Sequence, residues 1–173
     1  GMALSSLLLN KQSADITATD YHPEAQKFLQ RNALLNGAKS IAFEQADWAN
    51  KSDNLGLFDL IIGSDLLYED SHIESLSSFI EWHSKPSCEV IIVDPGRGRK
   101  NKLSSRMMEF GFTSSQQKPS HTDYLDQAFK GYILKFERGD LAFKIRTDKL
   151  KHLQLFFFSG YILAIIILAE SHR

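Results

Sequence analysis

The 173-residue chain has little cysteine and no excess of either charge. The presence of a single cysteine, Cys88, excludes a disulfide framework and a cysteine-based zinc cluster. It fits a reducing, cytoplasmic setting. We interpret Cys88 as a small core residue. Lys and Arg total 20 against 21 Asp and Glu, so no nucleic-acid partner is expected. The six histidines lack metal-ligand spacing, so no metal site is predicted. The apolar N-terminal region lacks the basic segment and cleavage site of a secretory signal.

Strand-like and helix-like segments alternate between Ile16 and Glu137. Apolar periodicity predicts strands over 16–20, 41–46, 58–64, 89–93 and 129–137. Helices are predicted from about residue 4, and over 22–37, 71–82 and 102–110. This alternation is typical of βαβ units and favours an α/β fold with a mainly parallel sheet and helices on both faces. The all-apolar segments 60–62 and 90–93 agree, because parallel strands are buried on both sides.

Four of the predicted strands end in an acidic residue. These strand ends contain Asp20 and Tyr21, Asp47 and Trp48, Ser64 and Asp65, and Asp94. For any one of these acids, a role in a turn or helix cap is as well supported as a role in ligand binding. Ligands of open α/β sheets, however, bind at the edge where the carboxyl ends of the strands lie. Asp20 suits ribose hydroxyls, Asp47 suits the amine of adenine, and Trp48 offers an apolar wall. The pattern therefore favours a pocket for an adenosine-containing cofactor.

These residues resemble the class I, seven-strand methyltransferases that use S-adenosylmethionine. The resemblance extends from Gly1 to about Arg138 and is carried by 18–24, Asn32, 47–48 and 58–68. Within it, Asp65-Leu-Leu-Tyr68 is similar to the Asp-x-x-Tyr signature of the protein-lysine methyltransferase group. Asp94-Pro-Gly-Arg97 is similar to a segment of the branch that methylates the electron-transfer flavoprotein β subunit. Nicotinamide N-methyltransferase-like proteins share much of the pattern.

The resemblance implies a Rossmann-like fold, S-adenosylmethionine as cofactor, and N-methylation of a protein lysine. A small, nicotinamide-like amine is the alternative acceptor. Asp65 would hold and orient an incoming ammonium, and Tyr68 would shape the slot beside it, with simple packing as the alternative for Tyr68. The implied cofactor-binding residues are Gly1, Asp20, Tyr21, Asp47, Trp48 and Ser64. A nicotinamide-dinucleotide dehydrogenase is disfavoured, because no complete G-x-G-x-x-G is present.

Both ends of the chain depart from the family pattern. Residues 1–6 resemble the end of the family's glycine-rich turn, so the N-terminal strand, central in the family's sheet, is expected to be missing from the chain. We expect a methyltransferase domain over 1–138 and a basic linker with an apolar tail over 139–173. A truncated, non-catalytic module of the same fold is therefore a second hypothesis.

The uncharged segment 153–169 allows three interpretations. It is short for a membrane anchor, and membrane contact is not favoured. Residues 161–168 are rich in β-branched side chains and apolar on both faces, which favours a central parallel strand. Such a strand would fill the empty central position within one chain or by swapping in a dimer. The third interpretation is a non-native tail from a gene rearrangement or reading-frame error.

A local basic run lies between 97 and 106 and includes Arg97, Arg99 and Arg106. Because the chain as a whole is not basic, we interpret this run as a solvated helix start rather than as a contact surface for an acidic partner.

Overall fold

The computed structural model describes residues 4–51, 55–120, 122, 129–139 and 164–168. Its helices are α1 (Leu4–Lys11), α2 (Glu24–Leu35), α3 (Asp70–His83) and α4 (Lys100–Glu109). Its strands are β1 (Ile16–Asp20), β2 (Ala42–Gln45), β3 (Phe58–Ser64), β4 (Ser84–Asp94), β5 (Thr113–Gln117), β6 (Tyr132–Arg138) and β7 (Ala164–Leu168). The alternation of strands and helices expected from the periodicity is confirmed.

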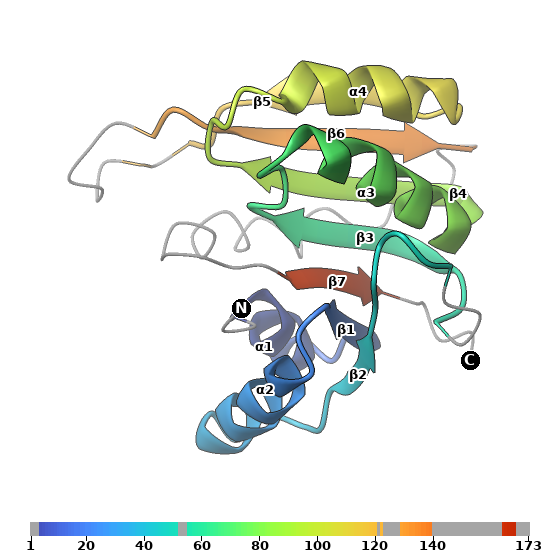
Figure 1. Ribbon diagram of the computed structural model, residues 1–173. Helices are drawn as coiled ribbons and strands as arrows, with labels where there is room; N and C mark the ends of the chain where they lie inside the picture. Colours follow the sequence, from blue (N-terminus) through green and yellow to red (C-terminus); the bar gives the residue numbers. More distant parts are fainter. Residues whose placement is uncertain (1–3, 52–54, 121, 123–128, 140–163, 169–173) are drawn as a thin grey trace.

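One sheet joins the strands in the order β2-β1-β7-β3-β4-β6-β5 (Figure 1). Within the described residues, β1–β2 and β3–β4 are parallel pairs, and the other four pairs are antiparallel. The sheet is therefore mixed, where a mainly parallel one was expected. The reason is that β6 and β7 run against their neighbours, and each reversed strand makes two antiparallel pairs. An apolar pattern reports burial and carries no information on strand direction.

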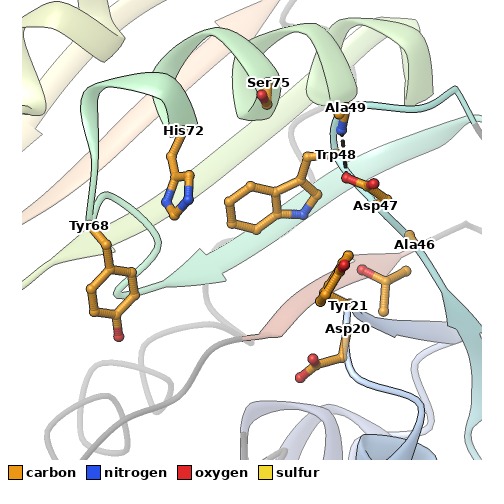
Figure 2. Close-up of a pocket in the computed structure, with 10 residues that line it drawn as sticks. Asp20, Tyr21, Ala46, Asp47, Trp48, Ala49, Tyr68, His72 and Ser75 are labelled. Carbon is orange, nitrogen blue, oxygen red and sulfur yellow. Dashed lines mark hydrogen bonds between the residues drawn. The ribbon is translucent and has the colours of Figure 1, made fainter.

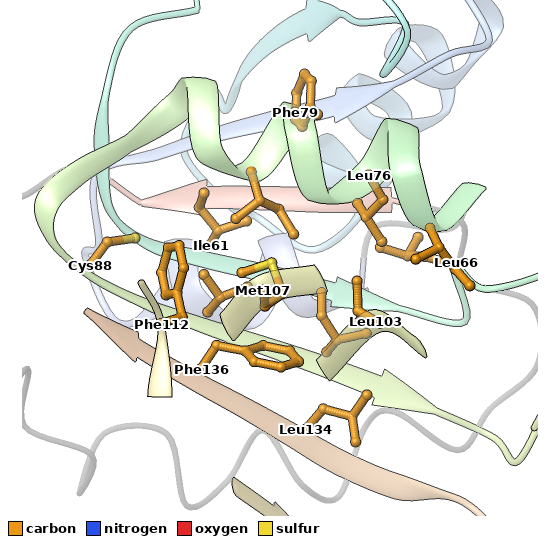
Figure 3. Close-up of a cluster of buried hydrophobic side chains, with 14 of the residues drawn as sticks. Ile61, Leu66, Leu76, Phe79, Cys88, Leu103, Met107, Phe112, Leu134 and Phe136 are labelled. Carbon is orange, nitrogen blue, oxygen red and sulfur yellow. The ribbon is translucent and has the colours of Figure 1, made fainter. Parts of the chain in front are cut away.

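Helices cover both faces of the sheet and divide the core in two. Ile61 of β3 belongs to a cluster with the apolar faces of α3 and α4, including Phe79 and Leu103 (Figure 3). Leu60 and Ile62 belong to a second cluster, formed with residues of α1, α2 and β1. Successive side chains of a strand point to opposite faces, so β3 contributes to both clusters. Its burial on both sides holds its carboxyl end, where the site begins, in a fixed position.

Two parts of the sheet escaped the sequence analysis. The edge strand β5 was not predicted, because its sequence, Thr-Ser-Ser-Gln-Gln, has no apolar residue and all five side chains are exposed. The amino end of β4 was also missed, since Ser84-Lys-Pro-Ser precedes the apolar part of the strand. In both places the backbone pairing with a neighbouring strand creates the element, and no apolar period accompanies it.

The tail strand β7 lies at the centre of the sheet, between β1 and β3 (Figure 1). It pairs along both edges, with Ile16 and Leu60 opposite Leu168, and with Ser64 opposite Ala164. Residues 164–168 thus form the central strand proposed for the tail, within one chain. They run antiparallel to both neighbours, which corrects the expected parallel direction. This strand satisfies the hydrogen-bonding groups on the facing edges of β1 and β3.

Other expectations for the two ends fall outside the described residues. Gly1 and most of 153–169 lie there. The division of the chain at 138 and a strand-swapped dimer stay predictions. In the part of the chain that the structure describes, no helix combines the length and apolar character needed to cross a membrane.

Candidate active site at the carboxyl edge of the sheet

A cavity of about 330 Å³ lies where β1 and β2 end and α3 begins (Figure 2). Its walls are formed by Thr19, Asp20, Tyr21, Ala46, Asp47, Trp48, Ala49, Tyr68, His72 and Ser75. Asp20, Tyr21, Asp47 and Trp48, the residues predicted from the sequence to bind the cofactor, all line this one cavity. Tyr68, assigned to the chemistry, lines the same cavity from the opposite side.

The two acids also stabilise the turns in which they lie. Asp20 Oδ1 accepts a hydrogen bond of 2.9 Å from the backbone N–H of His22. Asp47 accepts one of 2.9 Å from the backbone N–H of Ala49 and one of 3.0 Å from the side chain of Asn50. The turn role and the cavity position therefore coexist. Because a carboxylate oxygen accepts more than one hydrogen bond, the turn bonds do not close either acid to a ligand.

Aromatic rings connect the two sides of the cavity. The His72 ring meets Trp48 edge-on at 5.8 Å between centroids, and it meets Tyr68 edge-on at 6.5 Å. His72 and Ser75 escaped the sequence analysis. Their spacing of three residues on α3, directly after Tyr68, was the available signal, because residues three apart share a helix face.

Asp65 lies beside the cavity at the end of β3 and is engaged by two side chains. Tyr68 Oη donates a hydrogen bond of 3.0 Å to Asp65 Oδ2. Arg97 donates from Nε to Oδ1 at 2.5 Å and from Nη2 to Oδ2 at 2.8 Å, which makes a bidentate pair. The Arg97 guanidinium carbon also lies 3.9 Å from the centroid of the Tyr68 ring. Burial and the bond to Asp65 raise the pKa of Tyr68.

The turn after β4 places Arg97 at this point. Asp94 is completely buried, and its carboxylate accepts the backbone N–H groups of Gly96 and Arg97, each at 3.3 Å. Gly96 has φ +105°, a conformation that glycine adopts without a steric penalty. Burial raises the pKa of Asp94. The neighbouring strand end is tied in as well, since Asp65 N donates to Val93 O at 2.8 Å.

The role of Arg97 corrects the sequence interpretation of a solvated helix start. Its side chain is 30% exposed and paired with Asp65, which is 15% exposed. A contact between residues 32 positions apart has no local signal, although the Asp94-Pro-Gly-Arg97 segment marked the turn. Ser64 is buried at the end of β3, between Val93 and Ala164, and is not among the residues that line the cavity. Gly1 lies outside the described residues.

Solved structures define the class of fold. The chain is similar to a methyltransferase from Pyrococcus furiosus, with 19% identity, a TM-score of 0.55, and coverage of 72% of this chain and 62% of that one. A TehB-like SAM-dependent methyltransferase from Corynebacterium glutamicum gives 16% identity, a TM-score of 0.62, and coverage of 80% and 76%. A SAM-dependent methyltransferase from Methanosarcina mazei gives 14% identity and a TM-score of 0.64, with coverage of 80% of this chain and 88% of that one. The α/β fold is therefore that of S-adenosylmethionine-dependent methyltransferases.

The family follows from the sequence match. The family model described as lysine methyltransferase matches residues 1–109, more than half of the chain. The chain belongs to this lysine methyltransferase family. A search of curated proteins found no significant match.

Proposed function

We propose that the chain is an S-adenosylmethionine-dependent N-methyltransferase that acts on a lysine side chain of a protein. One observation carries the proposal: Tyr68 lines the cavity that contains Asp20 and Asp47, and it also hydrogen-bonds to Asp65. The residues suited to the cofactor and those suited to the acceptor therefore meet at a single side chain. Family membership supports a protein lysine as the acceptor.

The residues of the cavity fit the cofactor. Its volume of about 330 Å³ lies within the range of small-molecule pockets, about 300–1,000 Å³. Asp20 at the end of β1 would accept hydrogen bonds from ribose hydroxyls, and Asp47 after β2 would accept from the adenine amine. The Trp48 indole would cover an apolar face. When bound, S-adenosylmethionine supplies a methyl group already activated on a sulfonium centre.

The acceptor groups would present the lysine nitrogen. A lysine side chain has a pKa of about 10.4 and must lose a proton before its lone pair can attack. Asp65 and Tyr68 would orient the nitrogen at the edge of the cavity, where holding two reactants in line removes much of the entropic barrier. Water could take the proton, so no strong base is required.

Binding of the product S-adenosylhomocysteine tests the cofactor part of the proposal. We expect calorimetry to give a dissociation constant below millimolar for the chain. Asp20→Asn keeps the side-chain shape and should weaken binding about tenfold, because hydrogen bonds to a charged acceptor contribute about 1.5–3 kcal/mol. Asp15→Asn is the matched control, since the exposed Asp15 precedes β1 at the opposite edge of the sheet. A folded chain with no affinity would contradict the proposal.

Transfer of labelled methyl groups from S-adenosylmethionine into a cell lysate tests the acceptor part. We expect radioactivity in the protein precipitate and its loss with Asp65→Asn. Label recovered only in the small-molecule fraction would instead support a small amine as acceptor. Mass spectrometry of the labelled protein then identifies the modified residue as lysine or as another side chain.

A specific observation favours one second candidate, a non-catalytic module of the same fold. The central strand β7 runs antiparallel, so that its first residue, Ala164, lies opposite Ser64 at the carboxyl edge. In the family that this chain resembles, a parallel strand ends there and leads into a glycine-rich turn beneath the cofactor. An antiparallel strand in this position does not lead into such a turn at that edge, so it would not supply the close backbone approach that glycines permit. Failure to bind S-adenosylhomocysteine at millimolar concentration favours this candidate.

A further inference from the structure

We propose that Arg97 is a positioning residue that neutralises Asp65, so that an acceptor amine binds beside it without its proton. The inference rests on the proposed function and adds to it a residue that sets the charge state of the acceptor.

Both oxygens of Asp65 are engaged. Oδ2 accepts from Arg97 Nη2 at 2.8 Å and from Tyr68 Oη at 3.0 Å, and Oδ1 accepts from Arg97 Nε at 2.5 Å. The pair is largely shielded, with side-chain exposures of 30% for Arg97 and 15% for Asp65. Coulomb interactions are stronger in such a site than in open water. The carboxylate and the guanidinium therefore act as a neutral unit.

Other titratable groups surround the pair, and none of those described provides a further cation to the Asp65 carboxylate. Tyr68, which precedes α3, and Asp94 at the end of β4 contact the pair directly. Behind them lie His72, which meets the Tyr68 ring, and Asp70, which is bound by Arg99 and Lys102. Arg99 Nε is bound to Asp70 at 2.8 Å, and it reaches Arg97 through that residue's backbone oxygen. Asp94 accepts the backbone N–H of Arg97, and burial raises its pKa. Among the described residues, Arg97 is thus the cation that contacts the Asp65 carboxylate.

An unpaired Asp65 would work against methyl transfer. A partly buried carboxylate stabilises a neighbouring ammonium and raises its pKa. An ammonium has three donors and no lone pair, so a lysine held that way cannot attack a methyl group. With Arg97 in place this stabilisation is absent, and the nitrogen can bind in its neutral form. Arg97 keeps its place because Asp94 holds the turn at the backbone N–H groups of Gly96 and Arg97.

The first test measures the affinity of the pure chain for n-butylammonium, a minimal lysine side chain, by NMR titration at neutral pH. We expect Arg97→Met to bind it about tenfold more tightly than wild type, the effect of one pKa unit of charge interaction. Arg97→Lys retains a cation and should stay close to wild type. Arg97→Met combined with Asp65→Asn should lose the gain. Arg106→Met is the matched control, since Arg106 pairs with Glu74 at 2.5 Å and covers the Phe110 ring.

Absorbance titration of Tyr68 gives a second readout that needs neither acceptor nor cofactor. Arg97 favours the phenolate of Tyr68, so Arg97→Met should raise the pKa of this tyrosine further. Subtraction of the spectrum of a matching Tyr68→Phe variant isolates its signal from the other tyrosines. An unchanged Tyr68 titration together with an unchanged affinity for n-butylammonium would overturn the inference.

The labelling reaction separates this inference from the proposed function. In Arg97→Met, methyl transfer into lysate protein should fall at neutral pH and recover at about pH 9, where more of a lysine is neutral. If Arg97→Met transfers methyl groups with the same pH profile as wild type, the inference is wrong and the proposed function is supported. No transfer by any variant, with tighter n-butylammonium binding by Arg97→Met, would refute the proposed function while the neutralisation of Asp65 stands.

Discussion

Replacement of Gly131 by alanine tests the close packing between the start of β6 and the end of β4, next to the candidate site. Gly131 directly precedes β6, next to the end of β4. A Cβ atom added there would lie 2.1 Å from the carbonyl oxygen of Asp94 and 2.4 Å from the ring of Phe129. Real Cβ atoms essentially never come within 3.0 Å of such neighbours, and the first contact falls short of that by about 0.9 Å. Because the neighbour is backbone, a rotamer change cannot relieve the contact.

The two strand ends must therefore separate at Asp94, which pairs with Tyr132 as the last pair of β4 and β6. Overpacking of this kind costs about 1–3 kcal/mol. For a chain of this length, a loss of that size lowers the melting temperature by roughly 2–12 °C. Movement of Asp94 would also loosen the turn that carries Arg97, so the effect of the substitution should reach the site.

Urea unfolding followed by tryptophan fluorescence measures the loss as a lower midpoint. Gly37→Ala is the control, because Gly37 has open space around it and φ +60°. That variant should lose only the cost of a left-handed alanine, about 1 kcal/mol, without any change in the Tyr68 titration. If Gly131→Ala unfolds within about 0.5 kcal/mol of wild type, the close approach to Asp94 is not a constraint and the reasoning fails.

Three further predictions concern the core. Phe136→Ala should lower the free energy of unfolding in urea by about 3–5 kcal/mol, because Phe136 is fully buried. Leu34→Ala, at an 81% exposed position, should change it by no more than about 0.5 kcal/mol. Equal losses in the two variants would contradict the packing described. Burial raises the pKa of Glu89, so the stability that it contributes is present below its unfolded pKa of about 4.3 and is lost as pH rises through the folded value. Glu89→Gln should therefore lose less stability than wild type between about pH 4 and pH 7, and parallel urea midpoints would argue against this. Burial raises the pKa of the Cys88 thiol to about 11, which leaves a thiolate fraction of about one in a thousand at pH 8. A thiol reagent should therefore label Cys88 only when the chain unfolds. Fast labelling of the native chain would show instead that the thiol is accessible.

Sequence patterns predicted the structure best where the burial of side chains is the same along a whole segment. Residues 58–64 form a strand buried on both faces, as their apolar run predicted. Asp20, the last residue of β1, and Asp47, which follows β2, reached one cavity because parallel strands bring their carboxyl ends to the same edge. The Asp-x-x-Tyr spacing likewise placed Tyr68 within hydrogen-bonding distance of Asp65. In each case the relevant neighbours lie close in sequence or follow from a general rule of the fold.

The features that sequence reasoning missed depend on contacts between distant segments. The polar strand β5 exists because β6 offers it a pairing edge. Arg97 resembled one member of a solvated basic run until the pairing of β3 with β4 put it against Asp65. His72, near the start of α3, lines the cavity together with residues at the ends of β1 and β2, which lie far from it in the sequence.

The sequence by itself determined the alternation of strands and helices, the buried segments, and the acidic and aromatic residues available at one edge of the sheet. It could do so because periodicity and spacing record the local environment of each segment. Only the tertiary structure decided that β7 runs antiparallel at the centre of the sheet and that Arg97 pairs with Asp65. Strand direction and charge pairing arise from which segments become neighbours in space, and the one-dimensional pattern of residues does not contain that information.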